Sequence, residues 1–276
     1  MNILARLKIN TALAERLLTD FIHAEVTRVG LKRAVIGLSG GVDSALAATL
    51  AVKALGAPNV LGVMMPYRTS HPSSRTDAEE LIAQLGIPAR LIDITTLVEP
   101  YLTAYVNDNE KRRGNVMARA RMLVLYDQSE EFGGLVVGTS NKTEALLGYT
   151  TQFGDNAVAI QPLGDVYKTQ VWQLAEVLGV PPRIVKKAPS ADLWLGQTDE
   201  NELGFTYALA DQILYLLVDE RHRAEDVIAL GFEERVVREI EKRMQRNHFK
   251  RVTPPIAKLS PRTIGTDFLY PRDWGT

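Results

Sequence analysis

One stretch, residues 33–55 (RAVIGLSGGVDSALAATLAVKAL), limits what this chain can fold into more than any other. Residues 34–38 are a short apolar run with β-branched residues at its centre, which predicts a buried strand. Residues 45–55 are rich in Ala and Leu and end before Gly56, which predicts a buried helix with a glycine stop. The stretch therefore predicts a strand, a tight turn with the sequence SGGVDS, and a helix.

The turn has the chemistry of a phosphate cradle. A helix N-terminus presents free backbone N–H groups and the positive end of the helix dipole, and Gly40 and Gly41 let an anion approach closely. Ser39 and Ser44 add hydroxyl donors. Asp43 would repel a phosphate unless a divalent cation lay between them, so it predicts bound Mg²⁺. The alternative is an ordinary strand-to-helix turn in which Ser and Asp only cap the helix.

Composition narrows the class of protein. The chain has 276 residues, 46% of them hydrophobic, which is enough for one large α/β domain, with or without an appended arm. Its net charge of −1 argues against a general nucleic-acid binder, and its lack of cysteine excludes a disulfide scaffold, a zinc–thiolate site and a cysteine nucleophile. No apolar run approaches the roughly 18–20 residues that span a bilayer, and no secretory segment opens the sequence. We therefore expect a cytoplasmic enzyme with no membrane partner.

The rest of the chain alternates between the two kinds of element. A second buried strand is expected at residues 59–65, and two further strands are expected at residues 89–94 and 135–138. Helices are expected at residues 110–132, 169–178, 200–219 and 234–246. Strands that alternate with helices predict a doubly wound, mostly parallel sheet with helices on both faces.

Two stretches near the expected edge of the sheet are open to more than one interpretation. The polar segment 66–76 follows a strand, and it is either a mobile flap over a nucleotide or an ordinary connection. Ser74 or Thr76 is expected to cap the helix that follows it. The strand at 135–138 runs into a polar turn beside the first loop, where Glu144 is either a second metal ligand or a helix residue favoured by the dipole.

Basic residues supply further candidates for contact with anions. Lys168 stands at the start of an expected helix, where the dipole disfavours a cation, so it predicts a bound anion such as an ATP phosphate. Arg119 and Arg121 are flanked by Ala and Met, so at least one of them should point inward and need an anion.

SGGVDS resembles the pyrophosphate-binding loop of the N-type ATP pyrophosphatases, and further stretches resemble the NAD synthetase family among them. These stretches are residues 39–44, 115–122, 138–155, 162–171, 189–204 and 248–255. The resemblance implies that the nicotinate carboxylate of deamido-NAD attacks the α-phosphate of ATP, and that ammonia then attacks the acyl-adenylate. The products implied by the resemblance are NAD, AMP and pyrophosphate. Such catalysis rests on orientation and charge neutralisation and needs no nucleophilic side chain, which suits a chain without cysteine.

The resemblance also implies roles for single residues. ATP would be bound by Gly37, Leu38, Ser39, Gly40, Gly41, Val42, Asp43, Ser44, Thr139, Lys168 and Ser190. Asp43 and Glu144 would hold Mg²⁺, while Asp43 and Lys168 would offset transition-state charge. The dinucleotide would be contacted by Arg119, Gln152, Ala159, His248 and Lys250. Two of these positions depart from the family, which often has lysine at Gln152 and aspartate at Ala159.

The implied organisation is one NAD synthetase domain, 1–276, with an adenine nucleotide alpha hydrolase-like core, about 1–190, built on a five-stranded sheet. A helical C-terminal part, about 191–276, ends in an extended arm that wraps the body or a partner subunit. The family is homodimeric, and ammonia would arrive free or from a separate subunit. Two rival interpretations are a tRNA-modifying pyrophosphatase, which would need a basic extension and usually cysteines, and a protein that binds ATP without turnover.

Overall fold

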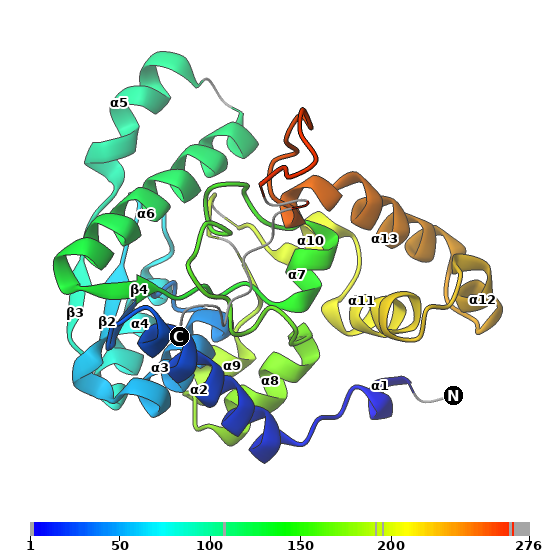
Figure 1. Cartoon of the computed structure of the whole chain (residues 1–276), viewed down its shortest axis with the longest axis horizontal. Coiled ribbons are helices and arrows are strands. Elements are labelled where there is room, and N and C mark those ends of the chain that lie inside the picture. Colours follow the sequence, from blue (N-terminus) through cyan, green and yellow to red (C-terminus); the bar gives the residue numbers. More distant parts are fainter. Residues whose placement is uncertain (1–2, 107–108, 191, 195, 265–266, 268–276) are drawn as a thin grey trace.

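A parallel four-stranded sheet forms the core of one side of the molecule, at the left in Figure 1. The structure is a computed structural model that describes residues 3–106, 109–190, 192–194, 196–264 and 267. The strands are β1 (Arg33–Gly37), β2 (Val60–Met64), β3 (Ala89–Leu91) and β4 (Gly134–Val136), in the order β3-β2-β1-β4. Because β1 lies between β2 and β4, the turn that follows β1 comes out in the middle of the sheet edge.

The expectation of five strands is wrong for the part of the chain that the structure describes. Ile160 forms only a single parallel bridge with Val137 beside β4. Pro162 follows two residues later and has no N–H with which to continue a ladder. The chain turns instead, with the amide of Gly164 donating to the carbonyl of Gln161 at 3.1 Å.

Helices cover both faces of the sheet, as a doubly wound fold requires. Ala34 and Ile36 of β1 face a cluster that includes α2 (Thr11–Arg28), α3 (Val42–Leu55), α4 (Pro72–Leu85), α8 (Lys168–Val177) and α9 (Pro182–Lys186). Val35, between those two residues, faces the other cluster with α5 (Thr95–Tyr105) and α6 (Glu110–Phe132). The alternation of side chains along β1 therefore sorts the helices into two layers.

A third apolar cluster lies beside the sheet layers and is helical. It is built from α1 (Ile3–Arg6), α7 (Lys142–Leu147), α10 (Asp199–Leu203), α11 (Tyr207–Leu214), a π-helix η2 (Tyr215–Asp219), α12 (Ala224–Ala229) and α13 (Glu234–Arg246). Tyr167, the residue before α8, also belongs to it, so this cluster packs against the start of a helix from the sheet layer. Short 3₁₀ turns η1 (Ala57–Asn59) and η3 (His248–Arg251) complete the elements.

The observed helix limits match the predicted ones where the apolar pattern extends over a long segment. They differ where a single residue, such as a glycine or proline, ends or begins a helix. The helices expected at 110–132 and 234–246 are confirmed as α6 and α13. The single helix expected at 200–219 is wrong, because Gly204 takes φ +82° and ends α10 before α11 begins. The expected cap at Ser74 or Thr76 is also wrong, since Pro72 opens α4 and His71 caps it.

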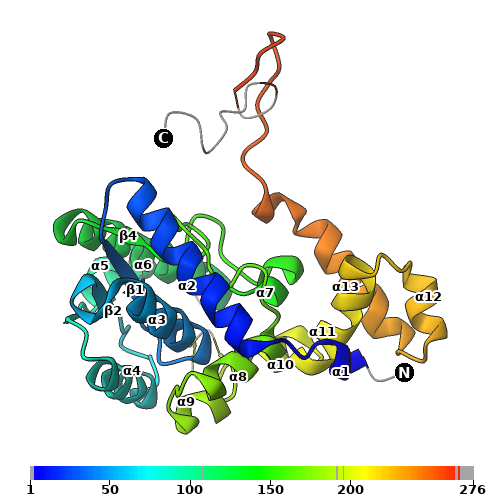
Figure 2. The same cartoon turned by 60° about the horizontal axis from the view of Figure 1, so that its bottom comes forward.

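The C-terminal arm begins after η3, and the described residues 252–264 extend away from α13 in Figure 2. The end of the arm beyond residue 267, together with residues 265–266, lies outside the described residues. Among the helices that are described, none has the length and apolar character needed to cross a membrane.

Candidate active site

The turn after β1 is a tight loop packed under the first turn of α4. Gly40 has φ +75°, and a Cβ built on it would lie 2.2 Å from the carbonyl oxygen of Ser74. Ser44 donates its hydroxyl to the carbonyl of Gly41 at 2.9 Å, and its oxygen lies 3.1 Å from the hydroxyl of Ser39. No side chain of the described residues caps α3 at Gly41, so within this part of the chain the backbone N–H groups at the helix start remain available to an anion.

The first turns of three helices, α3, α7 and α8, meet beside this loop. Lys168 is the first residue of α8 and is only 1% exposed. Its ammonium donates to one carboxylate oxygen of Asp43, in the first turn of α3, and lies 3.4 Å from a carboxylate oxygen of Glu144 in α7. The structure thus brings Asp43, Glu144 and Lys168 together, although they are far apart in the sequence.

The charges in this cluster do not balance. Burial lowers the pKa of Lys168, but the nearby carboxylates of Asp43 and Glu144 outweigh burial and raise that pKa above its ordinary value. Burial raises the pKa of Glu144 to about 8, with Lys168 opposing the shift and Asp43 adding to it. One ammonium therefore neutralises two carboxylates only in part, and the cluster favours a further cation or a proton.

The donor set suits Mg²⁺ in company with a substrate. Mg²⁺ is usually held by one or two carboxylates together with phosphate oxygens and water. Asp43 and Glu144 converge on one cation, the ammonium of Lys168. The described residues contain no group of three or more His, Cys, Asp or Glu arranged for a metal, so the remaining ligands would have to come from the substrate and water. Asp43 and Glu144 fit that requirement.

Asn141 is a residue of the cluster that the sequence prediction missed. Its side-chain amide donates to Asp43 at 2.8 Å, and its oxygen accepts from the amide of Glu144 at 3.0 Å. The second carboxylate oxygen of Glu144 accepts from the amide of Asn141 at 3.3 Å, which completes a capping box. Asn followed three residues later by Glu is the sequence signal of this arrangement. Glu144 thus caps its helix with one oxygen and faces Lys168 with the other.

Thr139 and Ser190, which are also expected to bind ATP, are not part of the Asp43 cluster. Thr139 follows β4 after Gly138, at the same sheet edge as the glycine loop. Ser190 donates its hydroxyl to the carbonyl of Gln197 at 2.7 Å and accepts from the amide of Asp192 at 3.1 Å. These contacts hold the turn of its own loop rather than the Asp43 cluster.

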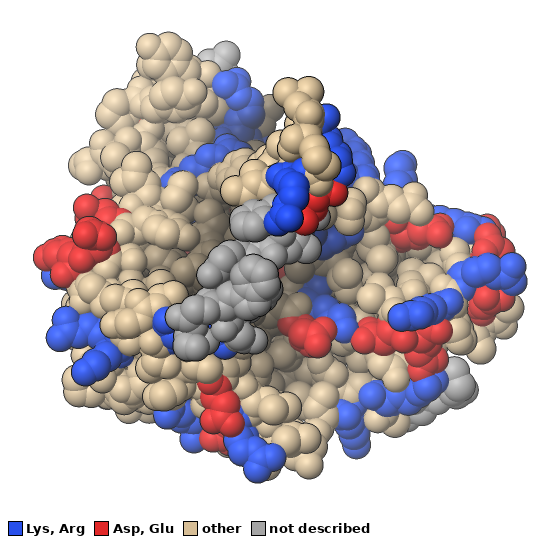
Figure 3. Space-filling view, viewed as in Figure 1, with Lys and Arg blue, Asp and Glu red and all other residues tan. Residues whose placement is uncertain are grey.

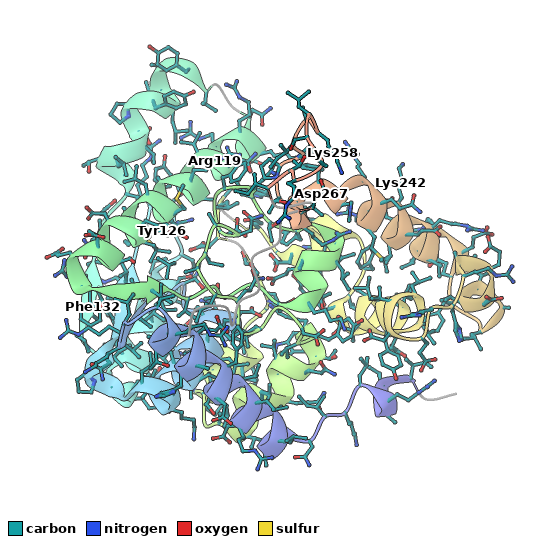
Figure 4. All side chains as sticks on the ribbon, viewed as in Figure 1. Arg119, Tyr126, Phe132, Lys242, Lys258 and Asp267 are labelled. Carbon is teal, nitrogen blue, oxygen red and sulfur yellow. The ribbon has the colours of Figure 1, made fainter. Side chains whose placement is uncertain are left out.

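The residues expected to contact the dinucleotide lie on or beside the loop at 148–159. Arg119, on the face of α6 seen in Figure 4, donates to the carbonyl of Gln152 at 3.2 and 3.3 Å. The ammonium of Lys250 donates to two backbone carbonyls at the start of this loop, each at 2.6 Å. Ala159 is exposed at its end, and His248 is exposed on η3. The structure therefore brings Arg119, Gln152 and Lys250 to one loop.

Of Arg119 and Arg121, Arg119 is exposed and it is Arg121 that points inward. Its Nε donates to the carbonyl of Met65, just beyond β2, at 3.1 Å. Burial lowers its pKa, and the charges of Asp192 and Asp155 partly offset that effect. A cavity of about 260 Å³ has Met117, one turn before Arg121 on α6, in its lining. Its lining residues are Tyr67, Arg68, Thr69, Glu110, Arg113, Met117, Leu193 and Trp194.

Comparison with known proteins identifies relatives over nearly the whole chain. The profile of the NAD synthase family matches residues 14–254. The chain is 53% identical to the NH3-dependent NAD⁺ synthetase of Trichlorobacter lovleyi over 272 residues, which are 99% of this chain and 100% of that protein.

Solved structures agree with that match. The NMN synthetase of Francisella tularensis is 34% identical with a TM-score of 0.81, covering 91% of this chain and 99% of that one. The NH3-dependent NAD synthetase of Campylobacter jejuni is 32% identical with a TM-score of 0.78, covering 91% and 100%. The glycine loop and its charged cluster thus lie in a chain that belongs to the NAD synthase family.

Proposed function

We propose that the protein catalyses the ATP-dependent amidation of deamido-NAD with ammonia, which gives NAD, AMP and pyrophosphate. One observation carries the proposal: the ammonium of Lys168 and the carboxylates of Asp43 and Glu144 meet at the mouth of a glycine loop that can bind phosphate. The curated relatives at 46–53% identity are named NH3-dependent NAD⁺ synthetases, which supports this reaction over other uses of such a loop.

In the first step an oxygen of the nicotinate carboxylate attacks the α-phosphorus of ATP. The bond from that phosphorus to the oxygen bridging the β-phosphorus breaks, and pyrophosphate leaves with the electron pair. The backbone N–H groups at the start of α3, with Ser39 and Ser44, would bind the departing pyrophosphate. Lys168 would offset charge on the phosphates, and Asp43 and Glu144 would hold Mg²⁺, which neutralises phosphate charge when it is bound.

In the second step the nitrogen of ammonia attacks the acyl carbon of the adenylate. The bond between that carbon and the phosphate oxygen breaks, AMP leaves, and the nitrogen loses a proton to solvent. Neither step uses a nucleophilic side chain, in keeping with the absence of cysteine from the sequence.

Arg119, Gln152, Ala159, His248 and Lys250 are proposed to lie on the dinucleotide side of the site. Arg119 supports this best, because it is exposed and its guanidinium already anchors the loop at Gln152. Arg119→Ala is expected to raise the KM for deamido-NAD by about tenfold, as the loss of a charged contact to a phosphate would. An unchanged KM for deamido-NAD would remove Arg119 from this role.

The protein is further proposed to form a homodimer through α5 and α6. Large apolar side chains are exposed along these two helices, and the corresponding surface is largely uncharged in Figure 3. They are Leu97, Tyr101, Tyr105, Leu123 and Tyr126. An apolar patch of this kind on a chain of mixed charge is typical of a protein–protein contact, and a second copy is the partner that the family resemblance implies.

A second candidate acceptor is the mononucleotide form of the substrate, nicotinate mononucleotide. One of the structural relatives is named an NMN synthetase, at 34% identity. The same adenylation and amidation chemistry would apply, with a smaller acceptor. The curated relatives named for NAD are more similar in sequence, which favours the dinucleotide.

The test is incubation of the protein with ATP, Mg²⁺ and ammonium chloride, with deamido-NAD and nicotinate mononucleotide supplied separately and then in competition. Formation of NAD, AMP and pyrophosphate in equal amounts supports the proposal. A higher kcat/KM for the mononucleotide assigns the second acceptor instead. ATP cleavage that ignores both acceptors, or binding of ATP without turnover, would refute both candidates.

A further inference from the structure

A carboxylate buried behind the charged cluster joins two of its helix starts. Asp211 of α11 is 0% exposed. One of its oxygens accepts from the hydroxyl of Thr143 at 2.6 Å, and the other accepts from the amide of Thr169 at 2.8 Å. Thr143 lies in the first turn of α7, and Thr169 lies in the first turn of α8. A single side chain therefore holds both turns.

The connection reaches the backbone of Lys168 itself. The hydroxyl oxygen of Thr143 accepts from the amide of Lys168 at 2.9 Å, while its hydrogen goes to Asp211. The first N–H groups of a helix have no partner within that helix, and here α7 and α11 supply partners for two of them. The start of α8 is thereby fixed relative to the start of α7, and not only by packing.

These two helix starts carry the charged side chains of the proposed site. Glu144 follows Thr143 directly, and Lys168 is the residue whose amide Thr143 accepts. We propose that Asp211 and Thr143 are positioning residues for the amidation reaction, which hold the ammonium of Lys168 in register with Asp43 and Glu144. This inference rests on the proposed function, because it assigns to Lys168 the role of binding ATP phosphate.

The same face of α11 also supports the side chain of Lys168. Tyr207 lies four residues before Asp211, one turn away on the helix, and its ring is 5.0 Å from the ammonium. The hydroxyl of Tyr207 donates to Asp199 at 3.0 Å, so the ring is held in place. Burial raises the pKa of Asp211, with Thr143 and Thr169 opposing the shift. α11 thus fixes Lys168 at its backbone through Asp211 and at its ammonium through Tyr207.

The first test compares three threonine variants. Thr143→Val keeps the shape and removes the hydroxyl, and it is expected to lower kcat by about tenfold and to raise the KM for ATP, with little change in the KM for deamido-NAD. Thr143→Ser restores the hydroxyl and is expected to stay within about twofold of the wild type. Thr49→Val is the matched control, since Thr49 is buried and, among the described residues, its hydroxyl bonds only to the carbonyl of Ala45 in its own helix.

The second test asks whether Thr143 acts through Lys168. Binding of ATP is measured by calorimetry, without turnover, for Thr143→Val, Lys168→Met and the double variant. If Asp211 and Thr143 act by positioning the ammonium, Thr143→Val weakens ATP binding when Lys168 is present. It has no further effect on ATP binding in the Lys168→Met background. Asp211→Asn is expected to behave like Thr143→Val, and if it fails to fold, the threonine series still decides.

Three results would overturn the inference: Thr143→Val with the kinetics of Thr49→Val, Thr143→Ser as impaired as Thr143→Val, or additive effects of Thr143→Val and Lys168→Met on ATP binding. Failure of the proposed function looks different. In that case the wild type forms no amidated product. The coupling between Thr143→Val and Lys168→Met in ATP binding is still measurable, and it still decides whether Thr143 and Asp211 position Lys168.

Discussion

Lys168 is a buried ammonium that faces two carboxylates and the ring of Tyr207. Burying a charge costs free energy unless the charge is paired and hydrogen-bonded. Here α3, α7 and α11 supply the groups that surround this ammonium. Binding of ATP would bring several negative charges to the same point. We infer that Asp43 and Glu144 keep the cation ordered until phosphate oxygens can share it.

Asp43→Asn is expected to abolish most turnover and to leave the fold nearly intact. The carboxylate is half-buried at the surface of the site, and its loss removes a charged ligand while Lys168 keeps Glu144 as a partner. We expect kcat to fall by at least about a hundredfold, as for loss of other groups that offset transition-state charge. Asp165→Asn is the control, because Asp165 is exposed and pairs only with Lys142 among the described ion pairs. Near-normal activity of Asp43→Asn would contradict the metal assignment.

The raised pKa of Glu144 gives a prediction about stability and pH. Its ordinary value is 4.5 and its value in the fold is about 8, so between these the folded chain binds more protons than the unfolded chain. The free energy of unfolding should therefore fall as pH rises through that window. Glu144→Gln cannot titrate, so denaturant unfolding of both proteins at about pH 5 and about pH 9 should show the larger loss for the wild type, by roughly 1 kcal/mol or more. Equal losses would show that Glu144 keeps its ordinary pKa in the fold.

Elements were predicted well from the sequence where a long pattern and its caps agree. α6 and α13 carry many turns of periodicity, and their limits match the predicted ranges. The glycine loop was predictable because strand, turn and helix lie within one short stretch. The break at Gly204 and the cap at His71 were missed because one local residue overrides a longer pattern.

Residues that act across the sequence could not be found in the same way. Asp211 lies 68 residues from Thr143, and no local pattern marks an aspartate in a mostly apolar helix as a partner of another helix start. Asp43, Glu144 and Lys168 were predicted as candidates because they lie in turns after strands or at the start of a helix. Asn141 had a usable signal, the capping box, within a segment already identified as functional.

Gly40 links two elements, and its replacement tests the contact between them. Gly40→Ala puts a Cβ against the backbone of Ser74 in α4 and also strains a residue at φ +75°. We expect the free energy of unfolding to fall by about 2 kcal/mol or more, with a higher KM for ATP. Gly86→Ala is the matched control, with φ +64° and nothing within 4 Å of its Cβ, so it measures strain alone. If the free energy of unfolding falls equally in both variants, the contact between α4 and the loop does not contribute to the effect of Gly40→Ala.

The exposed apolar face of α5 and α6 predicts the oligomeric state of the protein. We expect sedimentation to give the mass of a dimer for the wild type and of a monomer for the double variant Tyr101→Glu/Leu123→Glu. Leu230→Glu is the control, because Leu230 is similarly exposed but lies after α12, away from this face. A dimer that survives the double variant would place the contact elsewhere, and a monomeric wild type would refute it.

The single bridge between Val137 and Ile160 has a consequence for how this enzyme can change. The border of the sheet beside β4 is completed by the end of the loop at 148–159 and by Ile160, since Gly138 donates to the carbonyl of Ile160 and Ala159 donates to the carbonyl of Val136. That same loop is where the acceptor substrate is proposed to lie. A mutation that adapts the enzyme to a new acceptor therefore also alters the rim of its scaffold. Divergence in specificity should be slow there, and accompanied by compensating changes along β4.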